Sequence, residues 1–348
     1  MIGPEQLAAG ERAEMAGDYI AAVAAYRAVI AVPDERIAAQ AYFCLGRVSW
    51  RRSRFDASLE AFESAIVLAR RLGDLELQAR VENGIGAVHY ARGDYVTARH
   101  AYAAAQSHTR DDAMRGRIIL NLGVIENIEN NYSAACAHYE EAYRLFLESG
   151  DSDSATLALH NRGMVEADLA RWDDAVRSFL AALELATKAG NREMVAKTLV
   201  NLSEVLVERG AFDKAIEHCD RALAIYADVG DEVGRGEALR WRSHALGRSG
   251  ELIAAERNAN EALHIAMRCG ARLLEAEASR DVGVLRGLLG DRAGGIKQLR
   301  HALVLFNELG ARREAQEVGL LLQRPTPARS LERVEMDVDA DSTDDTSA

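Results

Sequence analysis

The chain has 348 residues, of which 49% are hydrophobic, 28% are charged and only 6% are aromatic, with four prolines and a formal net charge of −12. No apolar run is long enough for a membrane-spanning helix, and the first residues lack the basic-then-apolar pattern of a secretory signal. The acidic balance also excludes the basic footprint typical of nucleic-acid-binding proteins, so we expect neither a membrane nor a nucleic-acid partner.

A repeated pattern predicts helix starts at regular intervals along the chain. Each copy opens with an aromatic or other large residue and has a small residue three positions later. The opening residues, in chain order, are Tyr19, Phe55, Tyr95, Tyr132, Trp172, Phe212, Leu252 and Arg292. The interval is 36 to 40 residues and stays at 40 after Tyr132. A period of this length, held over eight copies, predicts an all-α protein made of stacked helical hairpins.

Small residues recur at three positions of nearly every copy, with Val29 as the exception. One set lies three residues after the opening residue, a second lies seven residues further on, and a third lies nine residues before it. The third set is Gly10, Gly46, Gly86, Gly123, Gly163, Ser203, Ser243 and Gly283. Helices approach closely only where side chains are small, so these positions predict an antiparallel helix pair in each copy.

Glycines and prolines mark the expected helix ends. Pro4 lies where a first helix would begin, and one glycine follows the second helix of most copies. These glycines are Gly73, Gly150, Gly190, Gly230, Gly270 and Gly310. A capping helix is expected near 311–323. Residues 324–348 read as a disordered acidic tail, since 331–348 hold seven acidic residues against one arginine.

This pattern resembles the tetratricopeptide repeat over residues 3–323. The units of about 40 residues are most similar to those of Pins-type adaptors, kinesin light chains and bacterial regulators, including peptide-sensing Rap-type proteins. The resemblance implies a right-handed superhelical solenoid of about eight hairpins plus a C-terminal capping helix. It also implies that the first helix of each hairpin lines a concave groove, which binds an extended or helical segment of a partner.

Mapping by repeat position gives a set of expected groove residues. The predicted peptide-binding residues are Arg80, Asn83, Arg117, Asn121, Asn127, His160, Asn161, Lys197, Asn201, Arg240 and Trp241. Asn121, Asn161 and Asn201 recur 40 residues apart. A carboxamide carries a donor and an acceptor, so it can pair with a peptide backbone of any sequence. The alternative is that these asparagines tie neighbouring first helices together. For Trp241, ligand binding and packing between hairpins both stay open.

No catalytic, metal or cofactor motif occurs in the sequence, so we expect no enzyme and no cofactor. The four cysteines never form a CxxC pair, which predicts free, mostly buried thiols in the reducing cytoplasm.

Two functions remain open. The first is a non-enzymatic adaptor or scaffold for protein–protein interaction. The second is a ligand- or peptide-sensing regulator acting through a separate effector. The first repeat begins near residue 3 and only the tail follows the last, which leaves little room for an effector and favours the adaptor. We expect a monomer by default. The partner is expected to be an acidic protein or peptide, because Arg47, Arg51, Arg80 and Arg117 fall on the N-terminal half of the inner face.

Overall fold

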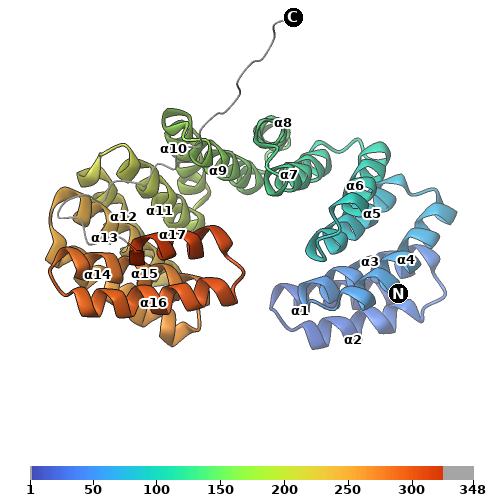
Figure 1. Ribbon diagram of the computed structural model, residues 1–348. Coiled ribbons are helices and arrows are strands. Elements are labelled where there is room, and N and C mark those ends of the chain that lie inside the picture. Colours follow the sequence, from blue (N-terminus) through green and yellow to red (C-terminus); the bar gives the residue numbers. More distant parts are fainter. Residues whose placement is uncertain (1, 324–348) are drawn as a thin grey trace, which may run out of the picture. The chain divides into compact units, whose positions relative to one another are not determined.

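The computed structural model describes residues 2–323, and every element in that range is an α-helix (Figure 1). The predicted tail at 324–348 lies outside the described residues. The helices are α1 (Ile2–Met15), α2 (Tyr19–Ile30), α3 (Glu35–Arg51), α4 (Phe55–Leu72), α5 (Leu75–Ala91), α6 (Tyr95–His108), α7 (Asp112–Ile128), α8 (Tyr132–Glu148), α9 (Ser152–Asp168), α10 (Trp172–Ala189), α11 (Arg192–Glu208), α12 (Phe212–Val229), α13 (Glu232–Ser249), α14 (Leu252–Cys269), α15 (Arg272–Leu288), α16 (Arg292–Glu308) and α17 (Arg312–Gln323).

Seventeen helices in the described range match eight hairpins and one capping helix, so the predicted all-α repeat fold is confirmed. The chain divides into two compact units, unit 1 (Met1–Met194) and unit 2 (Val195–Ala348). In unit 1, α1 to α9 each pack against the next helix of the chain, and in unit 2, α12 to α16 do the same.

Odd-numbered helices also pack against one another. Contacts join α1 to α3, α3 to α5, α5 to α7 and α7 to α9 in unit 1, and α13 to α15 in unit 2. The odd-numbered helices of each unit therefore form a layer of their own. We call the side chains that lie at or beside the contacts between neighbouring odd-numbered helices the odd-helix face.

The recurring glycines allow aromatic rings to pack directly on a helix backbone. Gly46 lies against the ring of Phe62, sixteen residues later in the same hairpin, and a Cβ added at Gly46 would lie 2.5 Å from that ring. The same pairing joins Gly10 to Tyr26, Gly86 to Tyr102, Gly123 to Tyr139 and Gly163 to Phe179. Where serine replaces the glycine, the residue sixteen positions on is smaller, as in Ser203 with Cys219 and Ser243 with Ala259.

Phe62 makes a second contact of this kind with the following hairpin. A Cβ added at Gly84 in α5 would lie 2.6 Å from its ring. The Phe62 side chain is 2% exposed, so it has little freedom to move away. Glycines on two successive odd-numbered helices thus make room for one core ring.

The predicted helix ends at glycines are confirmed. A second set of helix ends with positive φ, inside the hairpins, is absent from the sequence prediction. The six glycines that follow the second helices all have positive φ, between 65° and 77°. Positive φ also occurs at the turn inside each hairpin, where Ser53, Asn130 and Ala170 adopt the left-handed conformation alongside glycines. Because these three positions are not glycine, the sequence pattern did not reveal this second set.

Three of the four cysteines are buried or half-buried, as the sequence predicts. Cys44 and Cys219 are buried and Cys136 is half-buried, as expected for free core thiols, whereas Cys269 at the end of α14 is exposed. Among the described helices, none is both long enough and apolar enough to cross a membrane.

Candidate peptide-binding face

In unit 1 the odd-helix face begins at a buried carboxylate. Glu14 of α1 accepts a hydrogen bond of 2.9 Å from the Tyr26 hydroxyl. It also accepts two from Arg47 of α3, at 2.8 Å from Nε and 2.7 Å from Nη2. Burial raises the pKa of Tyr26, so its hydroxyl keeps its proton and donates. The bidentate pair neutralises Arg47 and joins α1 to α3.

Arg80 of α5 has no such carboxylate. Its guanidinium carbon lies 4.3 Å from the centroid of the Phe43 ring, and its Nη1 donates to Gln40 Oε1 over 3.4 Å. Burial lowers the pKa of Arg80, and repulsion from Arg47 and Arg117 lowers it further, while attraction to the Cys44 thiolate and the Glu76 carboxylate offsets part of this shift. An arginine nevertheless stays protonated in proteins. Arg80 is therefore a partly buried positive charge held by a ring and a neutral amide.

Arg117 of α7 follows Arg80 on the face and is exposed. It forms no hydrogen bond or ion pair with any residue in the described range. Glu14 on this face is already occupied by Arg47, and Arg51 shares it, with Nε 3.7 Å from Oε1. The face of unit 1 consequently has two arginines whose charge no carboxylate on it contacts.

The asparagines of α5 and α7 contact each other. Asn121 Nδ2 donates to Asn83 Oδ1 over 3.2 Å, which links the two helices. This bond favours the interpretation of Asn121 as a tie between neighbouring first helices. The Asn121 amide still has an acceptor and a second N–H, so the tie leaves capacity for a further partner. Asn127 and Asn161 are half-buried on α7 and α9.

Two predicted binding residues are buried instead of facing a ligand. His160 is 2% exposed, with its ring edge-on to Phe179 at 5.6 Å, and Arg240 is 8% exposed. Both occupy the repeat position of Leu120 and Val200, which are also buried. The position therefore belongs to the packed interior, and the apolar residues there were the sequence signal against assigning it to the surface.

The remaining predicted residues lie in unit 2. Lys197 of α11 is exposed, and Asn201 is half-buried. Trp241 of α13 is half-buried, with its ring 5.0 Å from that of His244 and 4.8 Å from the Arg240 guanidinium carbon. Packing against neighbours on its own helix thus explains much of the burial of Trp241.

Several arginines on the odd-helix face of unit 2 are paired with acidic residues. Asp281 of α15 is bound by His244 Nε2 at 2.7 Å and Arg280 Nε at 3.2 Å, with Arg240 Nη1 3.6 Å away. Burial alone would raise the pKa of Asp281, but His244, Arg280 and Arg240 together lower it below its ordinary value. Further pairs join Arg240 to Glu277, Arg280 to Glu317 and Arg248 to Glu208.

Phe43 and Gln40, the two partners of Arg80, were not among the residues predicted from the sequence. A signal for one of them exists, because Gln40 and Arg80 are 40 residues apart, which is one repeat. Side chains at equal positions of adjacent repeats lie on neighbouring odd-numbered helices and can therefore touch. The role of Asp281 as the centre of an ion network depends on three separate side chains and has no such periodic signal.

Comparison with known proteins agrees with this geometry. The family model described as tetratricopeptide repeat matches residues 37–110 and 154–228. The chain carries tetratricopeptide repeats in these two stretches. Each matched stretch spans the greater part of two of its hairpins, and the unmatched repeats share the same helix pattern.

Solved tetratricopeptide-type structures share the fold at low sequence identity. The apo form of RapI is 14% identical, with a TM-score of 0.71 over 92% of this chain and 95% of that one. A Rap protein complexed with Competence and Sporulation Factor is 12% identical, with a TM-score of 0.59 over 92% and 96%. A signal transduction ATPase with a tetratricopeptide repeat sensor, from Pyrococcus horikoshii, is 13% identical, with a TM-score of 0.70 over 88% of this chain and 48% of that one. No curated protein sequence matches the chain.

Proposed function

We propose that this protein is a non-enzymatic cytoplasmic adaptor that binds an acidic, extended or helical segment of a partner protein on the odd-helix face of unit 1. The observation that carries the proposal is the pair Arg80 and Arg117, neither of which contacts a carboxylate. In unit 2 the repeat position of Arg80 and Arg117 is occupied by Lys197, Glu237 and Glu277. Arg240 and Arg280, three residues further along the repeat, are already paired with acidic residues.

The physical basis is the difference between a free and a satisfied charge. A partner carboxylate that meets Arg80 gains a charge-assisted hydrogen bond without breaking an existing ion pair. The Phe43 ring under Arg80 holds the guanidinium in one place, which reduces the ordering cost of binding. In unit 2 a ligand carboxylate would have to displace Asp281 or Glu277 first. We therefore expect acidic segments to prefer unit 1.

A matched pair of double variants tests this function. The probe is a fluorescein-labelled peptide, Gly-Asp-Glu-Leu-Asp-Glu-Gly, followed by fluorescence anisotropy at low salt. Arg80→Gln with Arg117→Gln should weaken binding by about 5- to 30-fold, since each lost charged contact costs roughly 0.5–1 kcal/mol or slightly more when partly buried. Raising the salt to about 0.5 M should weaken binding to the unaltered protein as well.

The control removes the same net charge elsewhere. Arg27 on α2 and Arg144 on α8 are exposed and have no ion pair within the described range. Arg27→Gln with Arg144→Gln should leave the affinity within about twofold. Equal losses in both double variants would mean that only net charge matters, and the assignment to the odd-helix face would be wrong.

The alternative function is a sensor in which a bound ligand changes the arrangement of the repeats and a separate effector reads the change. It is favoured by the likeness in fold to a Rap protein complexed with a factor and to an ATPase with a tetratricopeptide repeat sensor. Small-angle scattering with and without saturating probe peptide separates the two functions. An adaptor keeps its radius of gyration on binding, whereas a sensor changes it.

A further inference from the structure

Unit 1 also has a pocket formed where α2 ends early. The second helices α4, α10, α12 and α14 have 18 residues, whereas α2 has 12 and ends at Ile30. Pro33, in the loop that follows, cannot supply the N–H that a continuing helix needs. The pocket of about 920 Å³ is lined by the end of α2, this loop, the start of α3 and the middle of α4.

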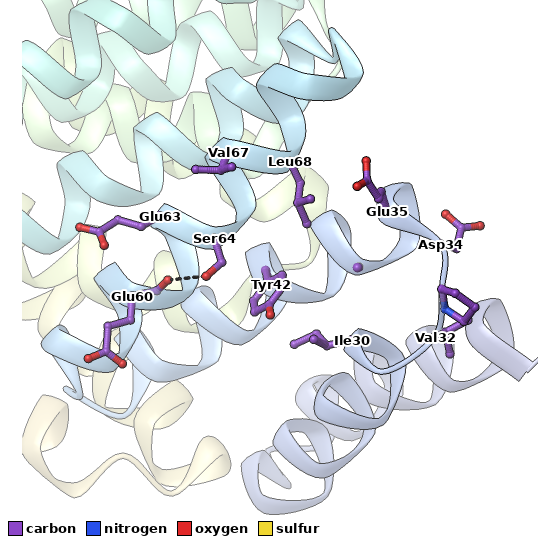
Figure 2. A pocket seen from close by; sticks show the side chains of 12 residues that line it. Ile30, Val32, Asp34, Glu35, Tyr42, Glu60, Glu63, Ser64, Val67 and Leu68 are labelled. Carbon is purple, nitrogen blue, oxygen red and sulfur yellow. Dashed lines mark hydrogen bonds between the residues drawn. The ribbon is translucent and has the colours of Figure 1, made fainter.

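The middle of the pocket is apolar and its two ends are acidic. Apolar lining comes from Ile30, Val32, Tyr42, Val67 and Leu68, and Val67 is 54% exposed. In Figure 2, the acidic side chains of α4 lie at one end and those of the α2–α3 loop and α3 at the other. Between them lie the apolar side chains of Ile30, Tyr42, Val67 and Leu68. These acidic residues are Glu60 and Glu63 at the first end, and Asp34 and Glu35 at the second.

The carboxylates at the two ends of the pocket differ in the hydrogen bonds and ion pairs that they already make. Asp34 caps α3 by accepting hydrogen bonds from the backbone N–H of Arg36 and Ile37, and Glu35 pairs with Arg71. Glu60 and Glu63 are exposed, and within the described range neither carboxylate has a hydrogen bond or an ion pair. The lining therefore carries negative charge that nothing in unit 1 neutralises.

We propose that this pocket binds a segment of a partner protein that has two or three apolar residues flanked on both sides by lysine or arginine. The apolar side chains would cover Val67 and its neighbours, and the cations on one flank would meet Glu60 and Glu63. The cations on the other flank would meet Asp34, whose cap uses only one carboxylate oxygen. Acidic lining repels nucleic-acid phosphates and anionic lipid surfaces. Cations at both ends of an apolar centre suit a peptide better than a small amine, which has one charge. The proposal goes beyond the function above, since it uses a different surface, formed by α2, α4 and other residues of α3, and has the opposite charge preference.

A labelled peptide of sequence Lys-Lys-Leu-Phe-Leu-Lys-Lys tests the proposal by fluorescence anisotropy on the full chain at low salt. Glu60→Gln with Glu63→Gln should weaken its binding by about three- to tenfold. The matched control is Glu148→Gln with Glu217→Gln, which removes two exposed carboxylates outside the pocket and should leave the affinity within about twofold. Ser64→Phe, which places a ring in the pocket, should weaken binding even though no charge changes.

Three results would overturn the proposal. The first is an equal loss of affinity in the pocket and control variants. The second is a probe with alanine in place of Leu-Phe-Leu binding as tightly, because the pocket's apolar middle would then play no part. The third is hexylamine competing as well as the peptide at equal concentration, which would assign the pocket to a small amine. The Arg80 and Arg117 double variant should bind this probe normally, which separates failure here from failure of the proposed function. Circular dichroism melting of every variant confirms that it is folded.

Discussion

At the scale of single residues, size matching between a small residue and a core residue sixteen positions later decides how closely each hairpin packs. Glycine meets Tyr or Phe in the first five hairpins, and serine meets cysteine or alanine in the next two. The sequence pattern predicted the small positions correctly. It did not predict their partners, because a pairing at a spacing of sixteen residues depends on where the two helices cross.

Replacing Gly86 by alanine tests this matching. The added Cβ would lie 2.5 Å from the Tyr102 ring, which is 1% exposed and has no space to move into. We expect a loss of about 1–3 kcal/mol of unfolding free energy in urea, typical of an overpacked core. Gly86→Ser combined with Tyr102→Cys, which copies the pair at Ser203 and Cys219, should remove the steric part of this loss.

Gly319 supplies the control for this change. It lies in helix α17, and a Cβ added there meets nothing within 4 Å. Gly319→Ala should raise stability by up to about 1 kcal/mol, because alanine is the better helix former. If both substitutions lower the unfolding free energy by similar amounts, replacing any helical glycine is destabilising. That result would contradict size matching at Gly86.

At the scale of helices, the odd-numbered layer is held by different forces in the two units. In unit 1, Arg47 with Glu14 and Asn121 with Asn83 join neighbouring helices. In unit 2, Asp281 of α15 is bound by His244 and Arg240 of α13. The sequence identified which helices carry these residues, since the repeat period assigns them. It assigned His160 and Arg240 to the binding face, although the apolar Leu120 and Val200 at the same repeat position indicated burial.

Because of Asp281, we expect unit 2 to lose stability when the pH falls into the acidic range. Its pKa in the folded protein is below the ordinary value of 3.8, so the charged form contributes stability that is complete above about pH 4 and is lost as pH falls further. Asp281→Asn should cost about 3–5 kcal/mol at pH 7, because it leaves His244 and two arginines without their shared partner.

The measurement is urea unfolding of the unaltered protein and of the Asp281→Asn variant between pH 7 and pH 2. The difference between them should narrow as pH falls below about 4. Glu217→Gln, at an exposed position on α12, is the control and should differ little from the unaltered protein at any pH. If the difference in unfolding free energy between the two proteins stays constant down to pH 2, the charge of Asp281 contributes no stability.

At the scale of the whole molecule, the seventeen helices of residues 2–323 follow one pattern, yet the residues in contact differ from one hairpin junction to the next. Phe62 of α4 needs the glycine at position 84 in the next hairpin. The period of the repeat predicted the number and order of the helices, because the period is a property of the chain alone. It could not predict which hairpins fit side by side, since that depends on single contacts across each junction.

Deleting residues 75–111, which form the α5–α6 hairpin, tests how specific these junctions are. The cut preserves the cap of the next helix, because Asp74 takes the place of Asp111 at the start of α7. However, Asn121 then replaces Gly84 opposite Phe62. We expect the shortened chain to melt at least several degrees below the full-length protein. Asn121→Gly in the shortened chain should recover a measurable part of that loss. No recovery would show that the Phe62 contact does not set the fit.

The contact between Phe62 and Gly84 has a consequence for how such a protein can change over evolutionary time. A duplicated or transposed hairpin would bring its own sixteen-residue pair with it and fold internally, but its outer surface would meet the wrong neighbour. Gain or loss of a repeat would therefore require a compensating substitution at the new boundary, as Asn121 to glycine would be here. The residues at each boundary are thus specific to the two hairpins that meet there. A chain with its hairpins in a different order would lose these contacts.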